Sequence, residues 1–212
     1  MKLYGYFRSS AAYRLRIALN LKGLDYDNIP VSLLAGDQRA ENYLKLNPQG
    51  LVPALTDGDL TIGQSMAILE YLEETRPDVP LLPADAAGRA RVRQMANIIA
   101  CDIHPLNNLR VLKYLGGNLG VSDETRDDWY RHWIRLGFEA IETMLQDGGT
   151  GTYCHGDTPT FAEVFLIPQL YNARRFKTQL DDFPIIRRIE KLCNEQEPFI
   201  QALPENQPDA TS

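Results

Sequence analysis

The sequence predicts an α/β region followed by an all-helical region. Over residues 1–75, short runs of β-forming residues alternate with runs that carry apolar residues at helical spacing. Over residues 86–200, nearly every apolar pattern is helical. Between the two regions, Pro77, Pro80 and Pro83 interrupt any periodicity, which is typical of an extended linker. We therefore expect two domains, with limits at 1–83 and 88–212.

The first region shows the order strand, helix, strand, helix, strand, strand, helix. We expect strands at 2–7, 26–31, 51–55 and 60–62, and helices at 11–22, 38–46 and 64–74. A strand–helix–strand sequence favours parallel pairing, whereas Asp57-Gly58-Asp59 is typical of an antiparallel hairpin turn. The expected result is a mixed four-stranded sheet covered by helices.

The second region begins with a long amphipathic pattern over residues 92–103. Pro105 should kink or split this helix because it removes a backbone hydrogen bond. A second long helix is expected over 123–146. Thr160 and Glu163 have the spacing of a capping box, which opens a helix over 164–171. A last helix is expected from 185 to about 197, and the polar tail after Pro204 should be loose.

Composition excludes several functions. The 212 residues include 22 Lys+Arg and 28 Asp+Glu, so the net charge is -6 and a basic nucleic-acid-binding face is not expected. No apolar run approaches the roughly 20 residues that span a bilayer, and the N-terminus lacks a signal-peptide pattern. Cys101, Cys154 and Cys193 are odd in number and far apart, which argues against a disulfide framework, and no metal-ligand spacing occurs. The sequence predicts a reduced, cytoplasmic protein without membrane contact or metal.

The first candidate site is Ser9-Ser10, where the first strand passes into the first helix. A helix N-terminus favours anions and lowers the pKa of a nearby thiol, and a serine hydroxyl can donate a hydrogen bond to a thiolate. Ser9 and Ser10 are also common residue types for a simple helix cap. Both interpretations stay open at this point.

Two further candidates lie in the same region. Proline at Val52-Pro53 does not suit a central strand, so either this is an edge strand or the bond is cis and the backbone of Val52 can pair with a peptide-like ligand. Gln64-Ser65 begins a helix and could hold a carboxylate with side chains and backbone N–H groups, or could simply cap it.

The second region offers polar residues after the proline kink and a pair of arginines. His104, Asn107 and Asn108 could line a cleft or form a solvated face. Arg174-Arg175 could bind a dicarboxylate, or could form surface ion pairs, a role we expect for one of the two. Cys154-His155 looks like a nucleophile and its base, although adjacent residues of an extended segment point in opposite directions.

Taken together, these motifs resemble the glutathione transferases, and in particular their zeta class of maleylacetoacetate isomerases. The resemblance covers about residues 1–200. The motifs that carry it are Phe7-Arg8-Ser9-Ser10, Asn47-Pro48, Val52-Pro53-Ala54-Leu55, Gln64-Ser65, Ile68-Leu69-Glu70-Tyr71-Leu72, Leu81-Leu82-Pro83, Ile103-His104-Pro105-Leu106, Gly156-Asp157 and Asn172-Ala173-Arg174-Arg175-Phe176. The resemblance implies a thioredoxin-like N-terminal domain, an all-α C-terminal domain, a homodimer, and glutathione as cofactor.

The resemblance also implies roles for single residues. Ser9, with Ser10 close by, would bind the glutathione sulfur, and Val52 before a cis Pro53 would pair with the cysteinyl backbone. The γ-glutamyl carboxylate would be held by Gln64 and Ser65, and the helical domain would close the site with His104, Asn107 and Asn108. Arg175, with Arg174 beside it, would hold the substrate carboxylate; Arg8 and Arg110 are further anion-binding candidates.

The implied reaction is the isomerisation of maleylacetoacetate to fumarylacetoacetate by reversible thiolate addition, a step of aromatic amino acid catabolism. Ala11 departs from the class signature, which commonly has cysteine there, so any side activity that needs a protein thiol is in doubt. Maleylpyruvate isomerases also lack this cysteine and remain an alternative. A general glutathione-conjugating transferase and a catalytically silent binding protein are the other two alternatives.

Overall fold

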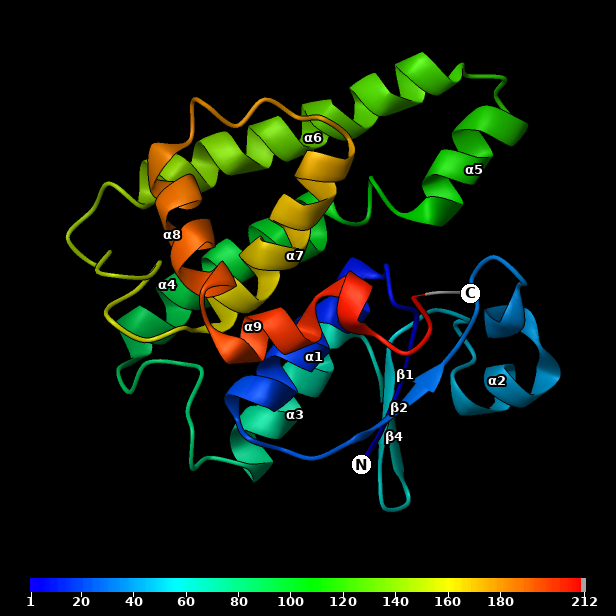
Figure 1. Cartoon of the computed structure of the whole chain (residues 1–212), viewed down its shortest axis with the longest axis horizontal. Coiled ribbons are helices and arrows are strands. Elements are labelled where there is room, and N and C mark those ends of the chain that lie inside the picture. Colours follow the sequence, from blue (N-terminus) through cyan, green and yellow to red (C-terminus); the bar gives the residue numbers. More distant parts are fainter. Residues whose placement is uncertain (211–212) are drawn as a thin grey trace. The chain divides into compact units, whose positions relative to one another are not determined.

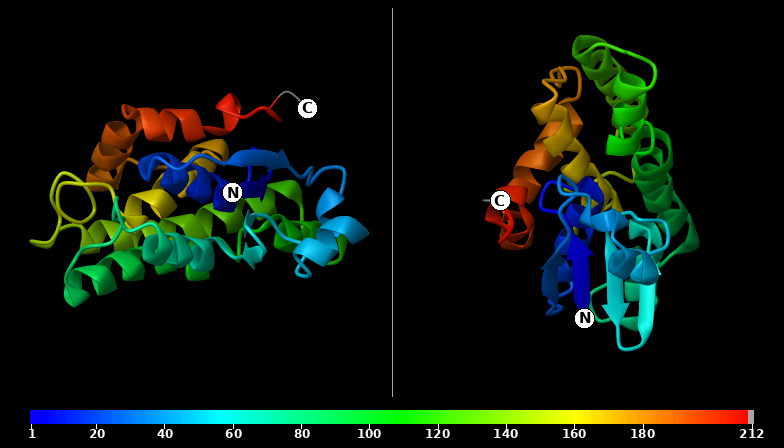
Figure 2. Two further views of the ribbon diagram at one scale, coloured as in Figure 1. Left: turned by 90° about the horizontal axis from the view of Figure 1, so that it is seen from below. Right: turned by 90° about the vertical axis from the view of Figure 1, so that its right-hand side faces the viewer.

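In the computed structural model, which describes residues 1–210, four short strands form one mixed sheet (Figure 1). The strands are β1 (Lys2–Gly5), β2 (Asp27–Pro30), β3 (Ala54–Asp57) and β4 (Leu60–Gly63), in the order β2-β1-β3-β4. β2 runs parallel to β1, whereas β3 is antiparallel to β1 and β4. The predicted mixed four-stranded sheet is confirmed, and the cyan hairpin β3–β4 is clear in the right-hand view of Figure 2.

The register of the sheet brings three chain segments to one end. Tyr4 of β1 lies opposite Ala54 of β3, and Ala54 lies opposite Gly63 of β4. Consequently β1 and β4 end, and β3 begins, at the same end of the sheet. We call this the site end of the sheet, because Ser9, Val52 and Gln64 lie on the segments that join the strands at this end.

Helices α1 (Ser10–Leu21) and α3 (Ser65–Thr75) begin beyond the site end and pack against each other. A short 3₁₀ turn, η1 (Asp37–Arg39), and α2 (Glu41–Leu46) replace the single helix predicted over 38–46, because Ala40 between them is extended. At the far end of α1, Lys22 Nζ forms a buried ion pair of 2.8 Å with Glu73 Oε2 of α3. The same ammonium donates to the carbonyls of Arg76 and Val79, which fixes the start of the linker.

The tail after Pro204 is hydrogen-bonded to the rest of the chain as far as residue 210, so the expectation of a loose tail is wrong for residues 205–210. Residues 211 and 212 of that tail lie outside the described part of the chain. Helix α9 (Glu197–Ala202) packs on α1, and the 3₁₀ turn η3 (Pro204–Asn206) follows it (Figures 1 and 2). Helix α9 is fixed to α1 because Arg16 Nε donates to the Ala202 carbonyl at 3.0 Å. The tail itself is held where the Phe7 N–H donates to Asp209 Oδ2 at 2.9 Å.

Contacts divide the described chain into two units. The first unit comprises residues 1–81 and 194–210, and the second comprises Leu82–Cys193. The domain limits 1–83 and 88–212 stay a prediction. The contact-based units differ from those limits in the tail, which joins the first unit because α9 packs on α1.

The second unit is helical throughout its regular structure. Its helices are α4 (Ala86–Asn97), the π-helix η2 (Ile98–Ile103), α5 (Leu109–Gly117), α6 (Asp123–Met144), α7 (Phe161–Arg175) and α8 (Pro184–Asn194). Of the kink or split predicted at Pro105, the structure shows a split, since the π-helix η2 and a turn separate α4 from α5. The predicted capping box is also confirmed: buried Glu163 accepts from the Thr160 N–H at 2.7 Å and from Cys154 N–H at 2.6 Å. The fold class, an α/β unit and an all-α unit, is therefore as expected. None of the helices within residues 1–210 has both the length and the apolar character needed to cross a membrane.

Candidate functional site

Ser9 is the N-cap of α1, and its side chain accepts a hydrogen bond of 3.3 Å from the Ala12 N–H. A hydroxyl has one proton to donate and two acceptor sites, so this cap leaves the Ser9 proton available for an anion. The first turn of α1, residues 10–13, carries no acidic side chain that would offset the positive end of the helix dipole. Capping and anion binding are therefore compatible roles for Ser9.

The segment before Ser9 is fixed through the backbone of Phe7. Its N–H donates to Asp209, and its carbonyl accepts from Arg16 Nη2 at 3.0 Å. Arg8 lies between Phe7 and Ser9 in the chain. Its guanidinium lies 5.1 Å from the centroid of the Phe7 ring and donates to Tyr6 Oη at 3.0 Å. The structure thus places Arg8 on the same short segment as Ser9, where its charge remains half-exposed.

The Val52–Pro53 bond is cis, which decides between the two interpretations of this proline. Leu51, the residue before Val52, is held firmly, because Tyr43 Oη and Asn47 Nδ2 both donate to its carbonyl at 2.7 Å. Burial raises the pKa of Tyr43 to about 12, so its phenol keeps its proton, and remains a donor, well into the alkaline range. Within residues 1–210, neither the N–H nor the C=O of Val52 has a hydrogen-bond partner. These two groups could pair with an extended peptide.

Gln64 and Ser65 form the start of α3. Gln64 has a φ of 67°, a strained left-handed value for a residue that is not glycine, and its amide donates to Gln49 Oε1 at 2.7 Å. Ser65 is the first helical residue, and its Oγ lies 3.1 Å from Arg14 Nη1. Sequence reasoning missed Arg14. The one signal that could have revealed it is a charged residue among the apolar positions of the first predicted helix.

In the second unit, the predicted polar residues surround the break between η2 and α5. Asn107 is buried and donates to the Tyr130 carbonyl at 3.0 Å, whereas Asn108 caps α5 by accepting from the Arg110 N–H at 3.1 Å. His104 directly follows η2 and is half-buried, and Arg110 is exposed on the first turn of α5. Each asparagine thus has a structural bond, while Arg110 extends into solvent.

The two arginines at the end of α7 differ in their surroundings. Arg174 binds Glu190 of α8 through Nε at 2.7 Å and again through Nη2, and this bond raises the pKa of Arg174. Arg175 forms no ion pair within residues 1–210, and its guanidinium lies 5.4 Å from the centroid of the Phe176 ring. Arg174 therefore has the ion-pairing role that was expected for one of the two, and Arg175 stays the candidate for anion binding.

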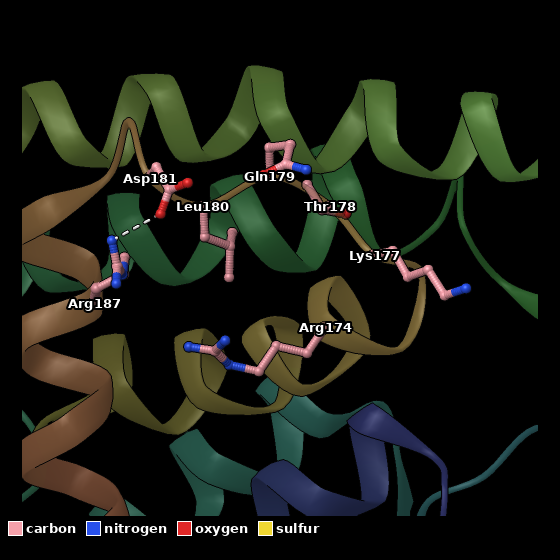
Figure 3. Close-up of a pocket in the computed structure, with 7 residues that line it drawn as sticks. All are labelled: Arg174, Lys177, Thr178, Gln179, Leu180, Asp181 and Arg187. Atoms are coloured by element: carbon pink, nitrogen blue, oxygen red, sulfur yellow. Dashed lines mark hydrogen bonds and ion pairs between the residues drawn. The ribbon is translucent and has the colours of Figure 1, made fainter.

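Arg174 also lines a hollow of about 350 Å³ beside the end of α7 (Figure 3). The other lining residues are Lys177, Thr178, Gln179, Leu180, Asp181 and Arg187. Arg187 and Asp181 pair at 3.0 Å across it. With Arg174 and Arg187 both bound to carboxylates, this hollow does not match the open anion site that the sequence suggested for the arginine pair.

Cys154 and His155 do not resemble an activated pair. The Cys154 side chain is buried, and desolvation raises the pKa of its thiol well above the ordinary value, which keeps it neutral. His155 Nδ1 instead lies 3.4 Å from Arg91 Nη1. Among residues 1–210, no group of three His, Cys, Asp or Glu side chains could hold a metal ion.

Comparison with known proteins identifies the family of the chain. Residues 1–74 match the family model of the glutathione S-transferase N-terminal domain. The chain is 48% identical to a probable maleylacetoacetate isomerase of Vibrio cholerae, over 98% of this chain and 97% of the relative. It is 47% identical to a maleylpyruvate isomerase of Ralstonia sp., over 99% of this chain and 100% of the relative.

Solved structures give the same result. The holo structure of a maleylpyruvate isomerase, described as a bacterial glutathione transferase of the zeta class, has a TM-score of 0.97 and 47% identity over 99% of each chain. A maleylacetoacetate isomerase from Methylobacterium extorquens AM1, with malonate and glutathione bound, has a TM-score of 0.95 and 42% identity over 98% of each chain. This chain therefore belongs to the glutathione transferase family, in its zeta class.

Proposed function

We propose that this protein is a glutathione-dependent cis–trans isomerase that converts maleylacetoacetate to fumarylacetoacetate. The observation that carries the proposal is the register of the sheet, which brings the segments bearing Ser9, Val52 and Gln64 to one end. Relatives named as isomerases of maleyl compounds, similar over nearly the whole chain, support the same reaction.

The residues at the site end fit the parts of glutathione in order. The open backbone groups of Val52 suit the cysteinyl peptide, and the N-terminus of α3 with Gln64 and Ser65 suits the γ-glutamyl carboxylate. The Ser9 hydroxyl and the start of α1, with Ser10 as its first residue, suit an ionised sulfur. When bound, glutathione supplies a thiolate that adds reversibly to the substrate alkene and so permits rotation about that bond.

The protein's own task is to hold charges in place. Ser9 donates its proton to the sulfur and keeps it ionised, while Arg175 binds a substrate carboxylate and fixes the orientation of the alkene. Arg8 and Arg110 remain candidates for a second carboxylate, and His104, Asn107 and Asn108 remain candidates for closing the site. Cys154 and Cys193 have thiols whose pKa values are raised by burial, so neither competes with the glutathione thiol as a nucleophile.

Maleylpyruvate is a second candidate substrate. The holo maleylpyruvate isomerase matches this chain with a TM-score of 0.97, and the maleylacetoacetate isomerase described above matches it with a TM-score of 0.95. Both substrates carry a maleyl carboxylate for Arg175 to bind. Ala11 stands where a cysteine is common in the class. The maleylpyruvate isomerases also lack this cysteine, which supports maleylpyruvate as a substrate.

The assembly we propose is a homodimer in the cytoplasm. All three cysteines are free, which suits a reducing compartment. Sedimentation analysis of the purified protein tests the dimer.

One assay tests the activity. Purified protein is given glutathione and either maleylacetoacetate or maleylpyruvate, and the trans product and free glutathione are both measured. The proposal expects trans product with no net loss of glutathione. Consumption of glutathione would indicate a conjugating transferase, and a calorimetric titration without glutathione binding would indicate a catalytically silent protein.

A further inference from the structure

Arg14 lies in the middle of α1 with only 2% of its surface exposed. Burying a guanidinium is costly unless its N–H groups bond to protein atoms. One of these bonds reaches the N-terminus of the neighbouring helix: Arg14 Nη1 lies 3.1 Å from Ser65 Oγ, and Ser65 is itself buried. A buried cation therefore touches a hydroxyl that the proposed function assigns to carboxylate binding.

The direction of this hydrogen bond follows from the chemistry of the two groups. A guanidinium has five N–H donors and no acceptor, and it does not lose its proton in proteins. Arg14 must therefore donate, and the Ser65 oxygen must accept. A hydroxyl that accepts from Arg14 has its single proton turned away from Arg14, so Ser65 can donate that proton to another group.

The backbone around Ser65 indicates where that group lies. Ser65 is the first residue of α3, so the N–H groups of residues 65–67 have no partner inside the helix, and the first helical hydrogen bond runs from the Ile68 N–H to the Gln64 carbonyl. An anion held by these N–H groups would also lie next to the Ser65 hydroxyl. A hydrogen bond from a charged donor polarises the hydroxyl that accepts it, which strengthens the bond that this hydroxyl donates.

We infer that Arg14 is a positioning residue for glutathione: it orients the Ser65 hydroxyl so that its proton points to the γ-glutamyl carboxylate. The inference rests on the proposed function, because it takes Ser65 as a ligand of that carboxylate. Arg14 itself does not touch the ligand. Its effect on glutathione binding should therefore require Ser65.

A double-mutant cycle tests this dependence. The variants Arg14→Met, Ser65→Ala and the double variant are titrated with glutathione by calorimetry. We expect each single change to raise the Kd on the order of tenfold, because a hydrogen bond that involves a charged group is lost or weakened. In the Ser65→Ala background, Arg14→Met should change the Kd by less than about twofold.

The cycle separates failure of the inference from failure of the proposed function. If Arg14→Met raises the Kd equally in both backgrounds, Arg14 acts independently of Ser65 and the inference is overturned while the proposed function stands. If Ser65→Ala leaves the Kd unchanged, the proposed role of Ser65 fails, and the inference fails with it.

Two further measurements cover the case in which Arg14→Met does not fold. Arg14→Lys keeps a donor and should restore part of the affinity. A second readout uses the glutathione analogue in which 4-aminobutanoyl replaces γ-glutamyl, which lacks only the γ-glutamyl carboxylate. The ratio of the Kd for this analogue to the Kd for glutathione should be smaller in Arg14→Lys than in the wild type. An unchanged ratio in Arg14→Lys, together with unchanged affinity, would contradict the inference.

Lys22→Met is the matched control. Lys22 is the C-cap residue of the same helix, is also buried, and also bonds to α3, but through Glu73 near the other end of that helix. Its loss should lower the unfolding temperature and leave the Kd for glutathione within about twofold of the wild-type value. If Lys22→Met weakened glutathione binding as much as Arg14→Met does, the effect of Arg14 would be one of general stability, and the inference would fall.

Discussion

The candidate residues of the two units differ in how they are fixed. In the first unit, sheet register, the cis bond and two helix N-termini place backbone groups and short side chains at the site end. In the second unit, the anion-binding candidates are long exposed arginines on α5 and α7. A site built from backbone is difficult to change by single substitutions, whereas a site built from exposed side chains is not. We therefore expect single substitutions to change substrate preference more readily than glutathione binding.

The largest expected effect concerns the first unit. Ser9→Ala should lower kcat about 100-fold at neutral pH, the order of effect seen when a donor to a developing anion is removed. The Kd for glutathione should change little, since the other contacts remain. The loss should shrink as the pH rises, because the thiol then ionises without help. Steady-state kinetics from pH 6 to 9 check this, with Ser9→Thr as the control that keeps a hydroxyl. A wild-type kcat in Ser9→Ala would remove Ser9 from this role.

The second prediction concerns the arginines of α7. Arg175→Ala should raise the substrate KM about tenfold or more with a smaller change in kcat, because its contact is already present in the ground state. Arg174→Ala should act mainly on thermal stability, since it leaves Glu190 without its partner. Kinetics and thermal unfolding of both variants separate the two roles. An unchanged KM in Arg175→Ala would shift the substrate contact to Arg8 or Arg110.

A smaller effect should follow from loosening the segment before Ser9. Asp209→Ala removes the acceptor of the Phe7 N–H, so we expect kcat to fall about threefold and stability to fall by about 1 kcal/mol. The control is Asn28→Ala, which removes a contact of the same tail at Gln207 and leaves Phe7 bonded. If the two variants had equal kcat values, the tie at Phe7 would not support catalysis.

The smallest expected effect is a pH dependence in the second unit. The hydrogen bond from the Gly88 N–H to Asp85, the N-cap of α4, lowers the pKa of that carboxyl. A carboxyl whose pKa is lower in the folded state stabilises the fold above its unfolded pKa and loses this contribution as the pH falls through the folded pKa. Asp85→Asn keeps a capping oxygen and removes the charge, so the unfolding temperature should fall less steeply between pH 5 and 3. Identical slopes in both proteins would show that this charge is unimportant.

The order of strands and helices in the first unit could be predicted from the sequence, because it depends on local patterns. The proline split at Pro105 and the capping box at Thr160 could be predicted for the same reason, since each is set by residues a few positions apart. In the rest of the helical region the prediction was less complete: α5 was missed, and the single helix expected from 185 to about 197 is two helices, α8 and α9. The isomer at Pro53 could not be decided, because it depends on tertiary packing around Leu51. The tail after Pro204 looked loose because one of its partners, Phe7, lies 202 residues away from Asp209 along the chain.

The site was predicted less completely than the fold. Its short motifs pointed to Ser9, Pro53 and Gln64, and the resemblance joined them into one site. Arg14 was missed because its importance lies in one contact with another helix. The pair Arg174-Arg175 could not be resolved, since the carboxylate that occupies Arg174 comes from Glu190, on the next helix of the chain.

The packing of α9 on α1 has a consequence for synthesis on the ribosome. Residues 194–210 complete a unit whose other part, residues 1–81, leaves the ribosome first, with the whole second unit made in between. Until translation of the second unit is complete, the newly made N-terminal part lacks α9, and the side of α1 that α9 covers stays exposed. We expect the loop that carries Ser9, which we propose binds the glutathione sulfur, to reach its final shape only after α9 emerges. Nascent chains truncated before that helix should therefore bind glutathione more weakly than the full chain.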